Sequence, residues 1–235
     1  MKGVGMAAIV TEEVSFPANG SEAPGYLARP GDGSPHPGVV VIQEVWGLDE
    51  HIKDVVRRFA SEGFVAVAPD LYRGKVAIDF EEARKIRMAL EFDQAMRDLQ
   101  GALDHLKGRA DVAPQRMGAI GFCMGGSLTQ QIALASSDLG AAAAFYGGRG
   151  APEPEELANV RCELLALYGE EDQGIPLERI EAIRAALERA GKPHEVVVYP
   201  GAPHAFFNDT RPSYREEAAK DAWERTLALF RRVLV

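Results

Sequence analysis

The chain has 235 residues and a formal net charge of -9. That length suffices for one large hydrophobic core, and 46% apolar with 26% charged residues is an ordinary globular composition. The acidic balance disfavours nucleic acid because no basic run offsets it. No apolar run reaches the roughly 18–20 residues that span a bilayer. We therefore expect no nucleic-acid or membrane partner, and a small neutral molecule as ligand.

The two cysteines, Cys123 and Cys162, stand in different sequence contexts. This argues against a disulfide scaffold and favours a reducing, cytoplasmic setting. The first residues are too short and polar for a signal peptide; Met1 and Met6 are both candidate starts, and a start at Met6 would make residues 1–5 an added or disordered extension. No repeat or long linker divides the chain, so we expect one domain over residues 1–235, as a monomer or small homo-oligomer.

Two N-terminal stretches, Glu13 to Phe16 and Tyr26 to Arg29, are predicted to pair as a short antiparallel hairpin. The apolar runs that follow lack alternation, a pattern typical of parallel strands covered on both faces. These predicted strands are residues 39–42, 64–68, 117–120, 141–145, 164–167 and 196–199.

Amphipathic helices are predicted between the strands, because apolar residues recur there at helical spacing. The clearest stripes cover residues 52–59, 180–187 and 219–230. Alternating strands and helices predict a single α/β domain with a mostly parallel central sheet and helices on both faces. Ligands of such sheets bind beyond the carboxyl ends of the strands, so candidate site residues are sought there.

A nucleophile turn is predicted at residues 121–126, Gly-Phe-Cys-Met-Gly-Gly, between a strand and a helix. This is the G-x-nucleophile-x-G pattern of α/β hydrolases, with Cys123 in place of the commoner serine. Glycines relieve the crowding of so sharp a turn, and the helix amino end favours a thiolate. A small buried cysteine is the alternative, but the strand–turn–helix context favours a nucleophile. Cys162 is not part of such a strand–turn–helix motif and is predicted to be structural.

The thiol needs a base, and the base needs an orienting acid. Only His194 and His204 follow the nucleophile turn. We select His204, because it follows the strand 196–199 at the same sheet edge as the thiol, whereas His194 precedes that strand. Asp172 is the favoured acid, on a turn before a helix that starts with proline. An exposed turn or N-cap aspartate is the alternative, and Glu170 and Glu171 compete on spacing alone.

Two N–H donors are needed to bind the oxyanion of an acyl-transfer intermediate. The backbone of Met124 is one candidate, and that of Val45, in the loop after the strand 39–42, is the other. Glu44 would then lie beside the thiol. The remaining histidines, His36, His51 and His105, have solvated or packed interpretations, and no pair has zinc-like spacing. We therefore expect no metal and no cofactor.

Five blocks of the chain together resemble the dienelactone hydrolase family, the carboxymethylenebutenolidase-like α/β hydrolases. They are residues 43–48 (QEVWGL), 68–72 (APDLY), 121–126 (GFCMGG), 168–172 (YGEED) and 201–206 (GAPHAF). The resemblance implies the α/β-hydrolase fold, a triad of Cys123, His204 and Asp172, and an oxyanion hole from Met124 and Val45. It also implies that Glu44 holds the resting thiol and shifts when substrate binds, which would protect the thiol from oxidation.

The chain departs from the family pattern at Asn208. Members that cleave dienelactone carry an arginine there, and a neutral amide cannot pair bidentately with a carboxylate. Arg84 and Arg87, on a helix predicted from Asp79, are candidate replacements. Neutral esters, lactones or other activated acyl compounds are therefore the expected substrates. Asn208 is itself a candidate pocket residue that would face the substrate. The aromatic candidates for the pocket, with a core role as the alternative, are Trp46, Tyr72, Phe122, Tyr146, Phe206 and Phe207.

The sequence thus predicts a metal-free hydrolase that forms a covalent acyl-enzyme on Cys123 and cleaves carboxyl esters or lactones. Phosphotriester hydrolysis by the same cysteine is the sibling alternative, and removal of the phosphoryl group from sulfur is its hard step. A peroxide-reactive thiol protein and a non-catalytic binding module are alternatives from other classes. The first leaves His204 and Asp172 without a role.

Overall fold

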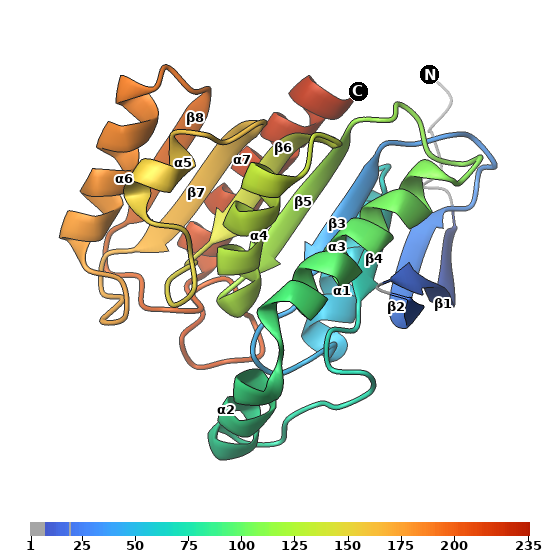
Figure 1. Ribbon diagram of the computed structural model, residues 1–235, viewed down its shortest axis with the longest axis horizontal. Helices are drawn as coiled ribbons and strands as arrows, with labels where there is room; N and C mark the ends of the chain where they lie inside the picture. The colour runs from blue at the N-terminus through green and yellow to red at the C-terminus, as the bar shows by residue number, and fades with distance from the viewer. Residues whose placement is uncertain (1–7, 19) are drawn as a thin grey trace.

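The computed structural model describes residues 8–18 and 20–235, so the proposals about residues 1–5 and Met6 concern residues outside the described part. One eight-stranded sheet, in the order β1-β2-β4-β3-β5-β6-β7-β8, runs through it (Figure 1). The strands are β1 (Ile9–Ala18), β2 (Ser21–Pro30), β3 (Gly38–Ile42), β4 (Val65–Pro69), β5 (Met117–Phe122), β6 (Leu139–Phe145), β7 (Glu163–Gly169) and β8 (His194–Tyr199). The helices are α1 (Glu50–Ser61), α2 (Phe80–Ala89), α3 (Phe92–Lys107), α4 (Met124–Ala135), α5 (Pro154–Leu157), α6 (Leu177–Arg189) and α7 (Glu216–Leu234).

The predicted fold class, a mostly parallel sheet with an antiparallel start, is confirmed. β1 pairs with β2 and β2 with β4 in antiparallel fashion, and the neighbours from β4 to β8 are parallel. Glu13 lies opposite Tyr26 in the hairpin, as predicted, but each hairpin strand has ten residues. The prediction for β1 was too short because β1 is an edge strand. Its residues alternate between exposed and partly buried and so form no apolar run.

Helices cover both faces of the sheet. In Figure 1, α3 and α4 lie in front of the sheet and α7 lies behind it. Phe59 of α1 contacts Trp223 and Phe230 of α7, so α1 shares the rear face. Asp49 caps α1 by accepting a hydrogen bond from the N–H of Ile52 at 3.1 Å. No helix in the described ranges is long and apolar enough to cross a membrane.

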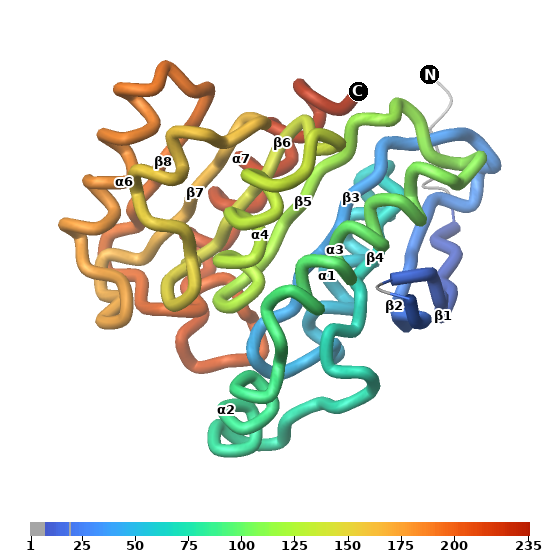
Figure 2. Tube along the Cα trace, in the orientation of Figure 1, coloured from blue at the N-terminus to red at the C-terminus, as the bar shows by residue number. Residues whose placement is uncertain are grey.

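The parallel strands all end at one edge of the sheet, toward which their arrowheads point in Figure 1. The connection from β4 to α3 projects beyond this edge and carries α2 at its tip (Figure 2). The loops after β3, β5, β6, β7 and β8 therefore meet at this edge, which is where ligands of such sheets bind.

Replacing Phe59 by alanine should destabilise the rear layer. The Phe59 side chain is fully buried between α1 and α7, and removing such a ring leaves a cavity that costs about 3–5 kcal/mol. Urea unfolding of the variant should show this loss in the free energy of unfolding. Ile78→Ala is the matched control, since Ile78 is 89% exposed and its loss should cost less than about 0.5 kcal/mol.

Candidate active site

Cys123 lies between the last residue of β5 and the first residue of α4. Its φ of 56° is in the left-handed region, which non-glycine residues adopt at a cost in strain. Its N–H donates to the carbonyl of Phe145 at the end of β6, at 3.1 Å, and its side chain is partly exposed. Tyr146 and Ala205 also have positive φ, so strained backbone gathers at this edge.

Gly125 lets the turn approach β3 more closely than any other residue would. A Cβ at this position would lie 2.3 Å from the carbonyl oxygen of Ile42 and 2.6 Å from that of Gln43. A Cβ at Gly121 would likewise lie 2.2 Å from the carbonyl oxygen of Gly125. The first turn of α4, which begins at Met124, therefore packs directly on the residues that lead into Val45. Met124 is the first residue of its helix, so its N–H has no acceptor within that helix.

His204 and Asp172 meet although they follow different strands. His204 Nδ1 and Asp172 Oδ2 are 2.6 Å apart, and the carboxylate is almost fully buried. The second oxygen of Asp172 accepts a hydrogen bond from the N–H of Gly174 at 2.8 Å, which fixes the carboxylate in its turn. The competitors Glu170 and Glu171 are exposed. Of the three acids in this loop, only Asp172 reaches His204.

Gly169 allows this meeting. A Cβ at Gly169 would lie 2.2 Å from the carbonyl oxygen of Ala202 and 2.9 Å from that of Pro203. The loop that carries His204 thus lies against the end of β7, from which the loop with Asp172 departs.

The imidazole of His204 links the carboxylate to the thiol. Burial alone would lower its pKa, but hydrogen bonds to Asp172 and to Cys123 outweigh burial and raise the pKa of His204 from 6.5 to about 10. The structure therefore favours a protonated imidazole between a carboxylate and a sulfur. Cys162 contrasts with this thiol, since burial raises the pKa of Cys162 to about 12, which fits its predicted structural role.

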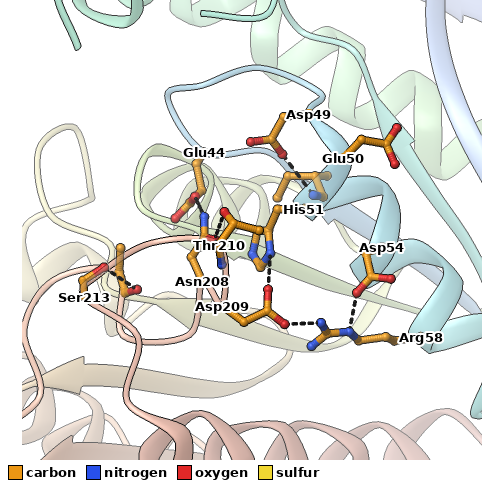
Figure 3. Close-up of polar contacts among 12 residues, drawn as sticks. Glu44, Asp49, Glu50, His51, Asp54, Arg58, Asn208, Asp209, Thr210 and Ser213 are labelled. Carbon is orange, nitrogen blue, oxygen red and sulfur yellow. Dashed lines mark hydrogen bonds and ion pairs between the residues drawn. The ribbon is translucent and has the colours of Figure 1, made fainter. Parts of the chain in front are cut away.

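Glu44 is 2% exposed, and two side chains donate hydrogen bonds to it. Asn208 Nδ2 donates to Oε2 at 2.7 Å, as Figure 3 shows, and the Tyr146 hydroxyl donates to Oε1 at 3.4 Å. Burial raises the pKa of Glu44, while His51 and the Asn208 hydrogen bond act in the opposite direction. Burial and the charge of Glu44 raise the pKa of Tyr146 well above 10, so its hydroxyl remains a neutral donor.

Asn208 was predicted to face the substrate, and this placement is wrong. The side chain is fully buried. While its amide nitrogen serves Glu44, its oxygen accepts hydrogen bonds from the N–H and hydroxyl of Thr210 at 3.0 and 2.6 Å. Asn208, at the position of the expected family arginine, therefore connects Glu44 to Thr210 through hydrogen bonds.

The other predicted pocket residues divide into three groups. Trp46 and Arg87 are partly exposed. Tyr72 and Tyr146 are buried but contact site residues, Tyr72 through the sulfur of Met124 at 3.4 Å and Tyr146 through the ring of His204 at 5.0 Å. For the third group the core alternative holds, because Phe122, Phe206 and Phe207 are buried aromatic core residues. Arg84 is exposed and pairs with Glu81, and its substrate role stays a prediction.

Sequence reasoning missed two residues of this region. Arg211 lies with its guanidinium 4.0 Å over the ring of Trp46, next to the proposed oxyanion loop. Asp209 lies 3.4 Å from His51, which is buried in the first turn of α1. No spacing rule connects these pairs, because their partners lie far apart in the sequence.

Gly169→Ala should reduce catalysis by displacing the His204 loop. Both near atoms are backbone atoms, so the loop must move, and a displacement of about 1 Å costs roughly 10²-fold in rate. Hydrolysis of p-nitrophenyl acetate gives the readout. Gly108→Ala, where the nearest atom is 3.5 Å away, should retain full activity, and equal rates for both variants would contradict this role of Gly169.

Asp172→Asn should have a lower free energy of unfolding than the wild type, and this difference should become smaller as pH rises. The pKa of His204 is raised from 6.5 to about 10 in the folded protein. Its protonation therefore stabilises the fold fully below pH 6.5, and this contribution is lost as pH rises toward 10. Urea unfolding at several pH values should show the wild-type advantage falling over this interval. A gap that is constant with pH, or one that Glu171→Gln reproduces, would rule out this linkage.

Comparisons with known proteins identify the family of the chain. Residues 23–234 match the model of the dienelactone hydrolase family. A protein of Methylorubrum extorquens AM1, provisionally named carboxymethylenebutenolidase, is 39% identical over 95% of this chain and 81% of its own length. The crystal structure of a provisionally named dienelactone hydrolase from Klebsiella pneumoniae superposes with a TM-score of 0.88 and 38% identity, covering 96% of this chain and 99% of the other.

A second similar structure is described as a dienelactone hydrolase-like promiscuous phosphotriesterase from metagenomic libraries. It has a TM-score of 0.86 and 26% identity, covering 97% of this chain and all of the other. The family match over nearly the whole chain and the identities near 38% are decisive. The chain therefore belongs to the dienelactone hydrolase family and is a hydrolase that acts on ester bonds.

Proposed function

We propose that this protein hydrolyses neutral, activated carboxyl esters or lactones through a thioester on Cys123. The observation that carries the proposal is that Asp172 lies 2.6 Å from His204 Nδ1 at the sheet edge where Cys123 precedes α4, and that the Cys123 side chain contributes to the raised pKa of His204. An arrangement of this kind activates a nucleophile and then delivers its proton.

The thiolate of Cys123 attacks the carbonyl carbon, and a carbon–sulfur bond forms as the carbonyl electrons move to oxygen. The N–H groups of Met124 and Val45 bind that oxyanion. When the intermediate collapses, the protonated His204 gives its proton to the departing alkoxide, and an alcohol leaves. His204 then takes a proton from water, whose oxygen displaces sulfur, so one ester and one water yield an acid and an alcohol. Asp172 holds the imidazole in the required orientation throughout.

A neutral substrate is supported by the surroundings of the site. Asn208 is buried and bonded to Glu44, so it is not available to a substrate carboxylate. The net charge of -9 and the exposed Glu170 and Glu171 beside Asp172 disfavour an anionic substrate. Glu44 remains the residue proposed to control the thiol, and a reactive thiol suits a reducing compartment such as the cytoplasm.

Cys123→Ala and His204→Ala should each lower kcat/KM for p-nitrophenyl acetate by at least ~10³-fold, because each removes a member of the catalytic unit. Mass spectrometry of the quenched wild type should find one acetyl group on the peptide that contains Cys123. All assays include a chelator, whose presence should leave the rates unchanged. Cys162→Ala is the matched control, since Cys162 is buried away from this edge, and it should retain wild-type kcat/KM.

A rate that survives in both variants would contradict the proposed nucleophile and base. Peroxide consumption without ester turnover would instead indicate a redox thiol protein.

Phosphotriester hydrolysis is the second candidate, favoured by the similarity to a promiscuous phosphotriesterase. The same chemistry would place a phosphoryl group on Cys123. A neutral aryl phosphotriester is therefore assayed in parallel. Turnover that depends on Cys123, beyond a single burst, would support this activity, whereas a stalled phosphoryl adduct would limit the protein to carboxyl esters.

A further inference from the structure

Exposed apolar side chains gather on one segment of the surface. Eight large apolar side chains are exposed among the residues that the structure describes, and five of them lie in or beside α2: Val76, Ile78, Phe80, Met88 and Phe92. We refer to these five residues as the α2 apolar cluster. Single exposed apolar residues are normal, whereas a cluster marks a binding surface. Figure 2 shows that this segment projects beyond the sheet edge that holds the candidate site.

The segment that carries the cluster is held against the loop after β3. The N–H of Ala77 donates to the carbonyl of Trp46 at 2.9 Å, and the ring of Phe80 meets the indole of Trp46 edge-on, with 6.5 Å between the ring centroids. A Cβ at Gly47 would lie 2.5 Å from the carbonyl oxygen of Lys75, so the two main chains are in direct contact. The cluster therefore borders the loop from which one of the proposed oxyanion donors comes.

The same segment also reaches the opposite side of the nucleophile turn. Arg87 of α2 donates a hydrogen bond to the carbonyl of Arg149, in the loop after β6, at 3.4 Å. The Tyr72 hydroxyl, at the start of the connection from β4, lies 3.4 Å from the sulfur of Met124. In the sheet, β5 lies between β3 and β6, and Cys123 follows β5. Because the connection contacts the loops on both sides of β5, it spans the strand end at which a substrate carbonyl would bind.

Phe80 and Met88 lie off the packed side of α2. Ala83 is fully buried and Ile86 packs against the core, which identifies the inward face of the helix. Phe80 and Met88 are 66% and 74% exposed, and helical residues eight positions apart lie on nearly the same side. Two large apolar side chains are thus presented together beside the site, where a hydrocarbon group would remove them from water.

We propose that the α2 apolar cluster binds a hydrocarbon group of the substrate, so that the substrates are esters or lactones with an apolar alkyl or aryl group. The inference rests on the proposed function, in which Cys123 attacks the carbonyl while the hydrocarbon group lies along Phe80 and Met88. Contacts made away from the reacting atoms raise kcat/KM when they are kept in the transition state. The side chains most exposed beside this strand end are apolar, so hydrocarbon is the chemistry that they recognise.

The experiment compares kcat/KM for p-nitrophenyl acetate, hexanoate and adipate, the last having an acyl chain as long as hexanoate that ends in a carboxylate. The wild type should prefer hexanoate to both other esters by about tenfold or more, as expected when several methylenes leave water. The double variant Phe80→Ser and Met88→Ser should lower the hexanoate-to-acetate ratio by about tenfold. Ile9→Ser is the matched control, since Ile9 is exposed and apolar but lies on the edge strand β1, and it should keep the wild-type ratio.

A second series of esters identifies the part of the substrate that the cluster binds. Methyl acetate and hexyl acetate carry the hydrocarbon chain on the alcohol instead of the acyl group. A dependence on Phe80 and Met88 that appears only with the alkyl acetates assigns the cluster to the alcohol, and one that appears only with the p-nitrophenyl esters assigns it to the acyl group. Either result supports a hydrocarbon site.

Binding is also measured without catalysis. Methyl hexyl ketone, a neutral compound that cannot be hydrolysed, is added to Cys123→Ala, and the ¹³C signal of the Met88 methyl group is followed. This signal is assigned by its loss in Met88→Leu, and it should shift in a saturable manner. The readout separates this inference from the proposed function. Ester hydrolysis that survives in Cys123→Ala would contradict the proposed nucleophile, whereas the Met88 signal would still report on the hydrocarbon site.

Several results would overturn the inference. Wild-type protein that hydrolyses short and long esters equally well in both series would show that hydrocarbon is not recognised, and an equal loss on the acetate and hexanoate esters in the double variant would indicate only a displaced loop. A preference for the adipate would assign the segment to a carboxylate. A wild-type dimer that dissociates in the double variant, with the ester ratio unchanged, would assign the cluster to a second copy of the chain.

Discussion

Backbone contacts that exclude any side chain determine the geometry of this site. The carbonyl oxygen of Ile42 would lie 2.3 Å from a Cβ at Gly125, and that of Ala202 would lie 2.2 Å from a Cβ at Gly169. The first contact brings the nucleophile turn onto the end of β3, and the second brings the His204 loop onto the end of β7. Cys123, His204, Asp172 and Val45 lie in separate loops, and such contacts between main chains fix these loops more rigidly than flexible side chains could.

Two groups of ionisable residues lie at this edge of the sheet. In front, His204 is protonated readily because Asp172 and the thiol both attract the proton. Behind, Glu44 is buried and accepts hydrogen bonds from the neutral donors Asn208 and Tyr146. Both arrangements include residues of the single loop after β8. Asp209 of this loop contacts His51 and Arg58 and so connects the loop to α1.

The departure from the family pattern at position 208 acquires a physical meaning in this context. An arginine there would be long enough to reach a substrate, whereas Asn208 is short, buried and bonded to Glu44 on one side and Thr210 on the other. The same position thus binds the buried carboxylate of Glu44 instead of facing outward.

Local patterns in the sequence were enough to predict the bounds of β3 to β8 to within two residues, the turn at Cys123, and the pairing of His204 with Asp172. Periodicity, glycine spacing and chain order carry this information along the chain, whereas the two hairpin strands are longer at both ends than predicted. Phe122, Phe206 and Phe207 could not be assigned in this way, since a strand-end aromatic can face either the core or the cleft, and packing decides which. The burial of Asn208 and the contact of His51 with Asp209 also required the tertiary structure. Both depend on how the loop after β8 packs against α1 and the loop after β3. The free energy of a buried charge depends on all groups around it rather than on its neighbours in sequence.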